Sequence, residues 1–185
     1  MTKVFIGGSR RVSVLNAQVG NRLDNIIQKE LPVVIGDANG VDKAVQRYLQ
    51  SRCYRNVEVF CSQGLCRNNL GEWRIRNVPA EGRGRDFAFY SAKDRAMTQE
   101  ATVGFMVWDG ASIGTLLNVF RLIKQQKKVV VYTVPDMGFQ ELKNGVAEWE
   151  SFASRFDAKL RQRVEERANQ EACGRKTTVE ASFRA

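Results

Sequence analysis

Three glycine-bearing turns of this chain carry residue types that bind phosphate. They run from Gly7 to Arg10, from Gly36 to Asp42 and from Asp109 to Thr115, and each follows a short apolar run. Backbone N–H groups in such a turn, beside the positive end of a helix, can hold an anion. A single glycine turn equally fits an ordinary connection between a strand and a helix. Three together favour one shared crevice.

The same turns, and the helix pattern that precedes the third, supply side chains suited to a phosphate or a sugar. Arginine can pair with phosphate in a bidentate manner, and serine or threonine hydroxyls can donate to it. The predicted ligand-binding residues are Gly8, Ser9, Arg10, Gly36, Asp37, Gly40, Asp42, Arg95, Ser112, Gly114 and Thr115. Structural alternatives stay open: Ser9 and Ser112 as helix caps, Asp42 as a first-turn charge and Asp109 as a turn former.

Alternating elements would place these turns together. Five apolar runs predict strands, at Lys3 to Ile6, Val33 to Ile35, Val57 to Phe60, Thr102 to Trp108 and Lys128 to Tyr132. Residues spaced by three or four between them predict helices, including one from Phe87 to Glu100. This order predicts an α/β fold, a Rossmann-like doubly wound parallel sheet of about five strands. Ligands of such sheets bind outside the carboxyl ends of the strands, near the point where strand order reverses.

Two stretches depart from this alternation. Residues 62–86 lose periodicity and read as an irregular basic loop, either a functional flap or a solvated connection. From Gly138, apolar residues recur every three or four positions, which predicts a long C-terminal amphipathic helix. That helix could pack on the sheet or pair with another copy, so we expect a homo-oligomer. The predicted divisions are a nucleotide-binding domain at 1–136, a helical extension at 137–172 and a polar tail at 173–185.

Composition narrows the class of protein. The net charge of +9 favours anionic ligands or polyanionic partners, although it also fits a solvated basic surface. The chain has no apolar run of about 18 residues, and its first residues enter a strand without the shape of a signal peptide. We therefore expect a cytoplasmic protein with no membrane partner.

Histidine is absent, and the chain has four cysteines. The absence of histidine removes a Ser-His or Cys-His pair, so acid–base chemistry would fall to carboxylates, Tyr, Lys or Cys. A zinc site would need the four thiolates to converge from distant positions. We expect reduced thiols, no metal site and no cofactor.

The motifs resemble the SLOG superfamily, which groups the Rossmann domain of DNA-processing protein A with the lonely-guy phosphoribohydrolases. Gly8-Ser9-Arg10 resembles G-[ST]-R, and Gly36 to Asp42 resembles G-x-A-x-G-[IV]-D. Lys93 to Met97 lies where these families place a polar, arginine-bearing helix, and Ser112 to Thr115 resembles S-x-G-T. The resemblance covers Val4 to about Pro135. It is strongest to small stand-alone members that bind nucleotide-derived ligands.

One departure concerns catalysis. The phosphoribohydrolases carry P-G-G-x-G-T-x-x-E, whereas Asn118 stands here at the glutamate position and Asp109-Gly110 replaces the proline-glycine start. Asparagine cannot act as a base at neutral pH. Either another carboxylate has taken over or the protein binds without cleaving. The catalytic candidates are Asp94, Asp109 and Asn118.

The leading hypothesis is binding of a nucleotide or nucleotide-derived molecule, with hydrolysis or transfer at its N-glycosidic bond if the protein is an enzyme. A signal sensor without turnover would use the same crevice. The alternative from another class is a single-stranded nucleic-acid-binding module. It would need aromatic side chains beside basic ones, and Trp73 with Arg74 and Arg76 is the cluster that fits.

Overall fold

The computed structural model describes residues 1–79, 87–143 and 145–182. The strands are β1 (Val4–Gly8), β2 (Val33–Gly36), β3 (Val57–Ser62), β4 (Arg74–Val78), β5 (Val103–Trp108), β6 (Lys128–Thr133) and β7 (Gly138–Leu142). The helices are α1 (Ala17–Gln28), α2 (Val41–Ser51), α3 (Phe87–Glu100), α4 (Ile113–Lys124), α5 (Val146–Ala153) and α6 (Ala158–Ser182). The helix predicted from Phe87 to Glu100 is confirmed as α3.

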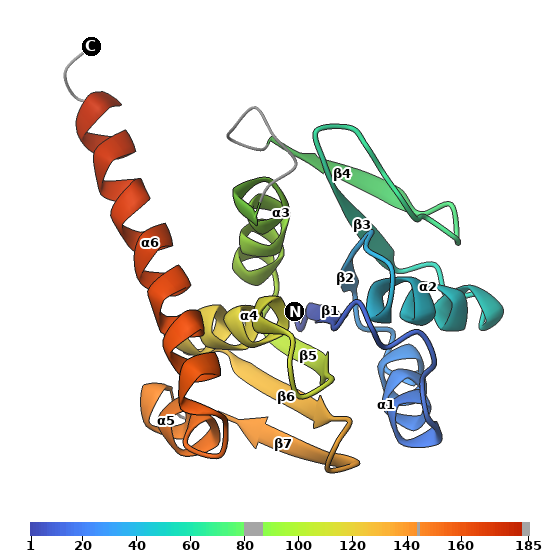
Figure 1. The fold of residues 1–185 in the computed structure, drawn as a ribbon. Coiled ribbons are helices and arrows are strands. Elements are labelled where there is room, and N and C mark those ends of the chain that lie inside the picture. The colour runs from blue at the N-terminus through green and yellow to red at the C-terminus, as the bar shows by residue number, and fades with distance from the viewer. Residues whose placement is uncertain (80–86, 144, 183–185) are drawn as a thin grey trace.

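Within the described residues the strands form one seven-stranded sheet in the order β4-β3-β2-β1-β5-β6-β7 (Figure 1). All neighbours pair in parallel except β6 and β7, which are antiparallel. After β1 the chain moves to β2 on one side, and it later returns to place β5 on the other side. The strand order therefore reverses between β1 and β5, which is where such folds bind ligands.

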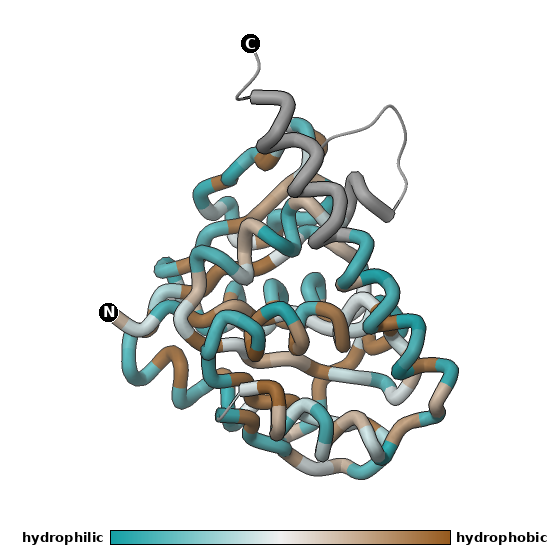
Figure 2. Tube along the Cα trace, turned by 90° about the vertical axis from the view of Figure 1, so that its left-hand side faces the viewer, coloured by the Kyte–Doolittle hydropathy of each residue, from teal (hydrophilic) through white to brown (hydrophobic). Residues whose placement is uncertain are grey.

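Helices cover both faces of the sheet. One apolar cluster packs α1 and α2 against one face, with Leu23, Ile35 and Leu49 fully buried within it. The second cluster packs α3, α4 and the C-terminal helices against the other face, around Phe5, Phe60 and Trp149. Hydrophilic and hydrophobic residues alternate along the helices (Figure 2), as amphipathic elements between a core and solvent require. The prediction of an α/β fold is confirmed, with a sheet that is mostly parallel.

The prediction of about five strands missed β4 and β7, the two edge strands. β4 lies inside the stretch predicted to be an irregular loop, and its residues are mostly polar because one side of the strand has no neighbour in the sheet. Glu58 on β3 pairs with Arg74 and Arg76 on β4. Residues 80–86 of the predicted basic loop lie outside the described residues.

The helix predicted from Gly138 is also wrong at its start. Residues 138–142 form β7, which turns back on β6 through a short connection where Met137 has a positive φ of 49°. α5 follows, and α6 begins only after Asp157, whose Oδ1 accepts hydrogen bonds from the N–H groups of Lys159 and Leu160. α6 then runs through Ser182, well into the predicted polar tail, and residues 183–185 lie outside the described part.

The apolar stripe of α6 is used within this chain. Leu160, Val164 and Ala168 pack against the same core cluster as α4. These side chains therefore have a partner inside the chain, which is the first of the two arrangements expected for this helix, and pairing with another copy stays a prediction. Within the described residues, no helix combines the length and the apolar character needed to cross a membrane.

Candidate nucleotide-binding cleft

A cleft of about 510 Å³ opens at the carboxyl ends of β1 and β5. Its walls come from the turns after β1, β2 and β5, from α3 and α4, and from one residue of α6. The lining includes three glycines, four arginines, one lysine and three aspartates. All three predicted turns contribute, so the structure brings together segments far apart in the sequence at the point where the strand order reverses.

The turn after β1 is held by close packing. A Cβ added at Gly8 would lie 2.3 Å from the carbonyl oxygen of Val107 and 2.8 Å from Cγ2 of Val41, so a side chain does not fit there. Ser9 is fully buried, and its Oγ accepts a hydrogen bond of 3.1 Å from the N–H of Asp109. Ser9 thus joins two turns and does not line the cleft. Arg10 and Arg11 lie at its rim.

The turn after β2 divides the predicted residues into two groups. Asp42 and Ala38 line the cleft, whereas Gly36, Asp37 and Gly40 lie behind its surface. Gly40 has a φ of +82°, and a Cβ there would meet the backbone of Arg10 at 2.5 Å. This glycine therefore allows the first two turns to lie against each other.

Asp37 is a buried member of an ion-pair network, not a ligand-holding group at the cleft surface. Its Oδ1 lies 2.6 Å from Nζ of Lys93 and 2.7 Å from Nη2 of Arg67. The backbone N–H of Arg67 also donates to Oδ2. Burial alone would raise the pKa of Asp37, but the hydrogen bonds from Arg67 and the charge of Lys93 outweigh it and hold the pKa well below its usual range.

Asp42 has the opposite character. It lines the cleft in the first turn of α2 and is 7% exposed. Burial raises the pKa of Asp42 to about 6, Lys93 partly offsets this rise, and the nearby Asp94 adds to it. A carboxyl group that titrates close to neutral pH inside a cleft is suited to proton transfer.

The turn after β5 forms the N-terminus of α4. Oδ1 of Asp109 accepts hydrogen bonds from the N–H groups of Ala111 (3.0 Å) and Ser112 (2.8 Å), which makes Asp109 a turn former. Burial opposes ionisation of Asp109, but these N–H groups outweigh it and lower its pKa. Ser112 caps α4 by accepting from the N–H of Thr115 at 3.4 Å. Asp109, Ser112 and Thr115 were predicted at this site, and they line the cleft together with Ala111.

Gly114 borders open space. A Cβ added there would find no heavy atom within 4 Å. Packing therefore does not explain this glycine, in contrast to Gly8, and the first turn of α4 is accessible from the cleft. An anion could approach the backbone N–H groups at this helix end.

A polar network lines the wall between α3 and α4. Nδ2 of Asn118 donates to Oδ2 of Asp94 at 3.3 Å, and Oδ1 of Asn118 accepts from Nη1 of Arg121 at 2.5 Å. Arg121 also donates to Oγ of Ser91. Asn118 is therefore oriented by a carboxylate and a guanidinium. Asp94 and Asn118 line the cleft as predicted, whereas Arg95 is half-buried on α3 and lies outside the lining.

Two cationic residues that line the cleft were missed by the sequence interpretation, namely Arg121 and Arg167. Two polar residues, Asn118 and Arg121, one helical turn apart inside the apolar α4 sequence, were a usable signal for a polar wall. Arg167 carries no local signal, because its position depends on how α6 packs against α4.

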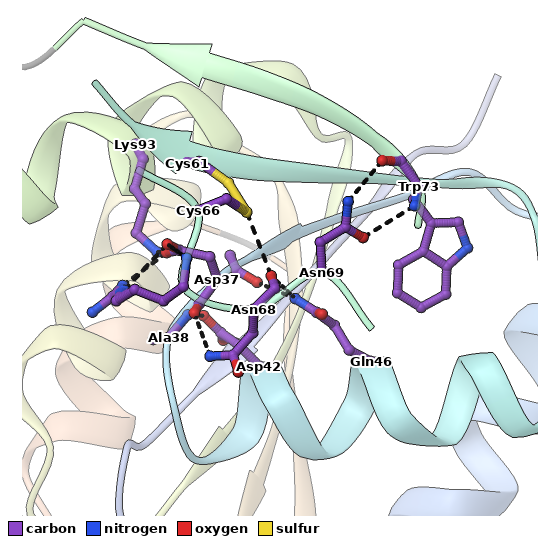
Figure 3. The surroundings of a disulfide bond; sticks show 12 residues. Asp37, Ala38, Asp42, Gln46, Cys61, Cys66, Asn68, Asn69, Trp73 and Lys93 are labelled. Carbon is purple, nitrogen blue, oxygen red and sulfur yellow. Dashed lines mark hydrogen bonds and ion pairs between the residues drawn. A yellow bond between two sulfur atoms is a disulfide. The ribbon is translucent and has the colours of Figure 1, made fainter. Parts of the chain in front are cut away.

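The cysteine prediction is wrong for one pair. Cys61 and Cys66 form a disulfide beside Asp37 (Figure 3), with a Cα–Cα distance of 5.1 Å. Donor atoms of Asp37 and the two cysteines lie within 4.8 Å of one another. The sulfurs are joined to each other, however, and Asp37 is paired with Lys93 and Arg67. This arrangement does not favour a metal ion.

Trp73 does not provide the stacking surface predicted for nucleic acid. The side chain is 6% exposed, and Nε1 donates to the carbonyl oxygen of Tyr54 at 2.8 Å. The side-chain amide of Asn69 accepts a hydrogen bond from the N–H of Trp73 and donates one to its carbonyl oxygen (Figure 3). Trp73 is thus a core residue, and its neighbours Arg74 and Arg76 pair with Glu58.

Comparisons with known proteins give one informative result. No protein-family model matches the chain, and no curated protein shows significant similarity to it. Among solved structures, the chain is similar to DNA processing protein A from Helicobacter pylori, from a study of its single-stranded DNA binding mode. The TM-score is 0.54 at 16% identity, covering 91% of this chain and 81% of that chain. The protein therefore has a fold like that of DNA processing protein A.

Proposed function

We propose that this protein binds a nucleotide or nucleotide-derived molecule in the cleft, with a phosphate at the N-terminus of α4. The observation that carries the proposal is the open first turn of α4 at Gly114, inside a cleft of about 510 Å³. The volume lies within the range of small-molecule sites. The helix dipole and the rim arginines both favour a negative charge at this position.

Equilibrium binding of nucleoside monophosphates, followed by calorimetry, tests the proposal. Arg10→Gln should weaken binding roughly ten- to a hundredfold, because a charge-assisted hydrogen bond contributes roughly 1.5–3 kcal/mol. Arg47→Gln is the matched control, since Arg47 is an exposed arginine of α2 that lies outside the cleft lining. Equal affinities of the two variants would contradict the proposal.

The carboxylates of the cleft fit a reaction at the N-glycosidic bond of that ligand. Asp42 would give a proton to the departing base, and Asp94 would stabilise positive charge on the sugar. Asp109 is less suited to either role, because backbone N–H groups engage its Oδ1. Incubation with nucleoside monophosphates and NAD, with detection of free base, tests this reaction. If no free base is released, the reaction is excluded, and binding without turnover, as in a nucleotide sensor, is the function that remains.

Single-stranded DNA binding is the second candidate function. The likeness to DNA processing protein A and the net charge of +9 support it. Burial of Trp73 weighs against it, since the predicted stacking platform is part of the core. Oligonucleotide affinity that falls steeply with salt would support this candidate. No binding at low salt would exclude it.

A further inference from the structure

The disulfide between Cys61 and Cys66 lies between an exposed turn and the buried charges behind the cleft. Cys61 is fully buried in β3, whereas Cys66 is half-buried and follows a turn whose residues 63–65 are exposed. A Cβ added at Gly64 in this turn would meet no heavy atom within 4 Å. The two sulfurs and a carboxylate oxygen of Asp37 lie within 4.8 Å of one another (Figure 3). Cys66 is therefore the more accessible end of a bond that borders a buried carboxylate.

A continuous line of short contacts leads from Cys66 to the cleft. Arg67 follows Cys66 directly, and its backbone N–H (3.0 Å) and its Nε (3.1 Å) donate to Oδ2 of Asp37. Oδ1 of Asp37 accepts from Nη2 of Arg67 at 2.7 Å and from Nζ of Lys93 at 2.6 Å. Lys93 lines the cleft. The position of Cys66 is thus coupled to a cationic residue of the cleft through one carboxylate.

The charges along this line give the coupling a sign. A Cβ added at Gly36 would lie 2.9 Å from Nζ of Lys93 and 2.4 Å from Oδ2 of Asp42, so the ammonium group lies close to a carboxyl group of the cleft. Asp37 carries one negative charge, whereas Arg67 and Lys93 carry two positive charges. While Arg67 is paired, an excess positive charge remains beside the cleft and favours an anion there. If Arg67 withdraws, Asp37 neutralises Lys93 and the excess is lost.

Reduction of the disulfide acts on the first contact of this line. It replaces a covalent bond by a nonbonded contact, so the two sulfurs move apart. Cys61 is held in the sheet, because β3 has β2 on one side and β4 on the other. The movement therefore falls on Cys66 and on Arg67, whose backbone N–H and guanidinium both bind Asp37.

We infer that the Cys61–Cys66 bond is a redox-reactive site that regulates the cleft, so that the oxidised protein holds Arg67 on Asp37 and binds an anionic ligand more tightly than the reduced protein. This inference rests on the proposed function, since it concerns the affinity of the cleft for a nucleotide. The reactant that it requires is a dithiol.

The reducing step is a thiol–disulfide exchange. One thiolate of the dithiol attacks Sγ of Cys66, which forms a mixed disulfide and releases Cys61 as a thiolate. The second thiolate of the reductant then attacks the reductant's own sulfur in the mixed disulfide and releases Cys66. Each released thiolate takes up one of the two protons that the reductant lost. Two electrons pass to the protein, and the reductant leaves as its own disulfide.

Amide hydrogen exchange of Arg67, with and without dithiothreitol, tests the structural half of the inference without a ligand. The N–H of Arg67 is bonded to Asp37 in the oxidised protein, so we expect its exchange to become about tenfold faster on reduction. Cys53→Ser is the matched control, because Cys53 is an exposed free cysteine, and it should respond as the wild type does. Cys61→Ala combined with Cys66→Ala should exchange fast under both conditions. Thermal unfolding verifies that this variant is folded, and the comparison of oxidised with reduced wild type decides without it.

Calorimetric titration with AMP tests the regulation. The reduced wild-type protein should bind AMP about fivefold more weakly than the oxidised protein, because the cleft loses part of one unit charge. Cys53→Ser should show the same difference. The variant without Cys61 and Cys66 should bind AMP as the reduced protein does, whether or not dithiothreitol is present.

The outcomes separate the regulation from the proposed function. The regulation is refuted if dithiothreitol does not reduce the bond in the native protein, if Arg67 exchanges equally fast in both states, or if both states bind AMP equally. In each of these cases, binding of AMP still supports the proposed function. If AMP binds neither state, the proposed function is refuted, and its regulation with it.

Discussion

Replacing Gly114 by aspartate separates ligand binding from stability. Gly114 is the second residue of α4, and a Cβ there would meet no heavy atom within 4 Å. A negative charge in the first turn of a helix stabilises it by roughly 0.3–1 kcal/mol. The substitution should therefore leave the free energy of unfolding unchanged or raise it slightly. Most substitutions that abolish ligand binding at a site lined by buried residues also lower stability. Loss of binding with unchanged or higher stability therefore distinguishes Gly114→Asp from such substitutions.

The same charge should oppose a bound phosphate. Two like charges about 4 Å apart at an effective dielectric constant of about 20 repel by roughly 4 kcal/mol, which corresponds to about a thousandfold loss of affinity. Calorimetry with a nucleoside monophosphate measures the affinity, and urea denaturation measures the stability. Gly114→Asn is the matched control, because it adds nearly the same volume without the charge. Wild-type affinity in Gly114→Asp, or an equal loss in Gly114→Asn, would refute the electrostatic reasoning.

Three further predictions concern buried groups. Above pH 6 the ionised form of Asp42 costs the native state up to about 3 kcal/mol relative to the unfolded chain, because its pKa is raised from 3.8 to about 6. Asp42→Asn should therefore gain stability relative to wild type between pH 4 and pH 7 in urea denaturation, and parallel curves would contradict this. Asp37→Asn leaves Lys93 without its buried carboxylate and should cost about 3–5 kcal/mol. Asp37→Asn combined with Lys93→Met should recover part of that loss, and full additivity of the two substitutions would contradict the pairing. Thiol titration of the denatured, unreduced protein should find at least two of the four cysteines blocked, since Cys61 and Cys66 form a disulfide. Four reactive thiols would refute the bond.

The central strands could be predicted from the sequence, whereas the edge strands could not. β5 is buried on both faces and reads as a nearly continuous apolar run. β4 carries Arg74, Arg76 and Asn77, because an edge strand faces solvent and its polar residues find partners such as Glu58. β7 could not be predicted because its polar and apolar residues alternate only briefly before α5 begins. The apolar residues of β7 and α5 together are spaced by three or four, which predicts one helix.

The turns that form the cleft could be predicted from the sequence, because a glycine turn is recognised from a short stretch of neighbouring residues. The roles within those turns depend on tertiary packing. Ser9 and Asp37 looked like ligand-binding residues, yet one joins two turns and the other neutralises Lys93 and Arg67. Asp42, predicted to hold the ligand, lines the cleft and has a raised pKa. Its raised pKa comes from burial, which a sequence pattern does not reveal.

Amide chemical shifts during a nucleotide titration test the central claim most directly, because they report where a ligand binds as well as whether it binds. The account predicts concentration-dependent shifts at Gly8, Gly114 and Thr115, which are among the residues that line the cleft at the β1 and β5 turns. It predicts little change at Arg74 and Ile75 on the β4 edge. Shifts confined to β4, or none at millimolar nucleotide, would contradict it.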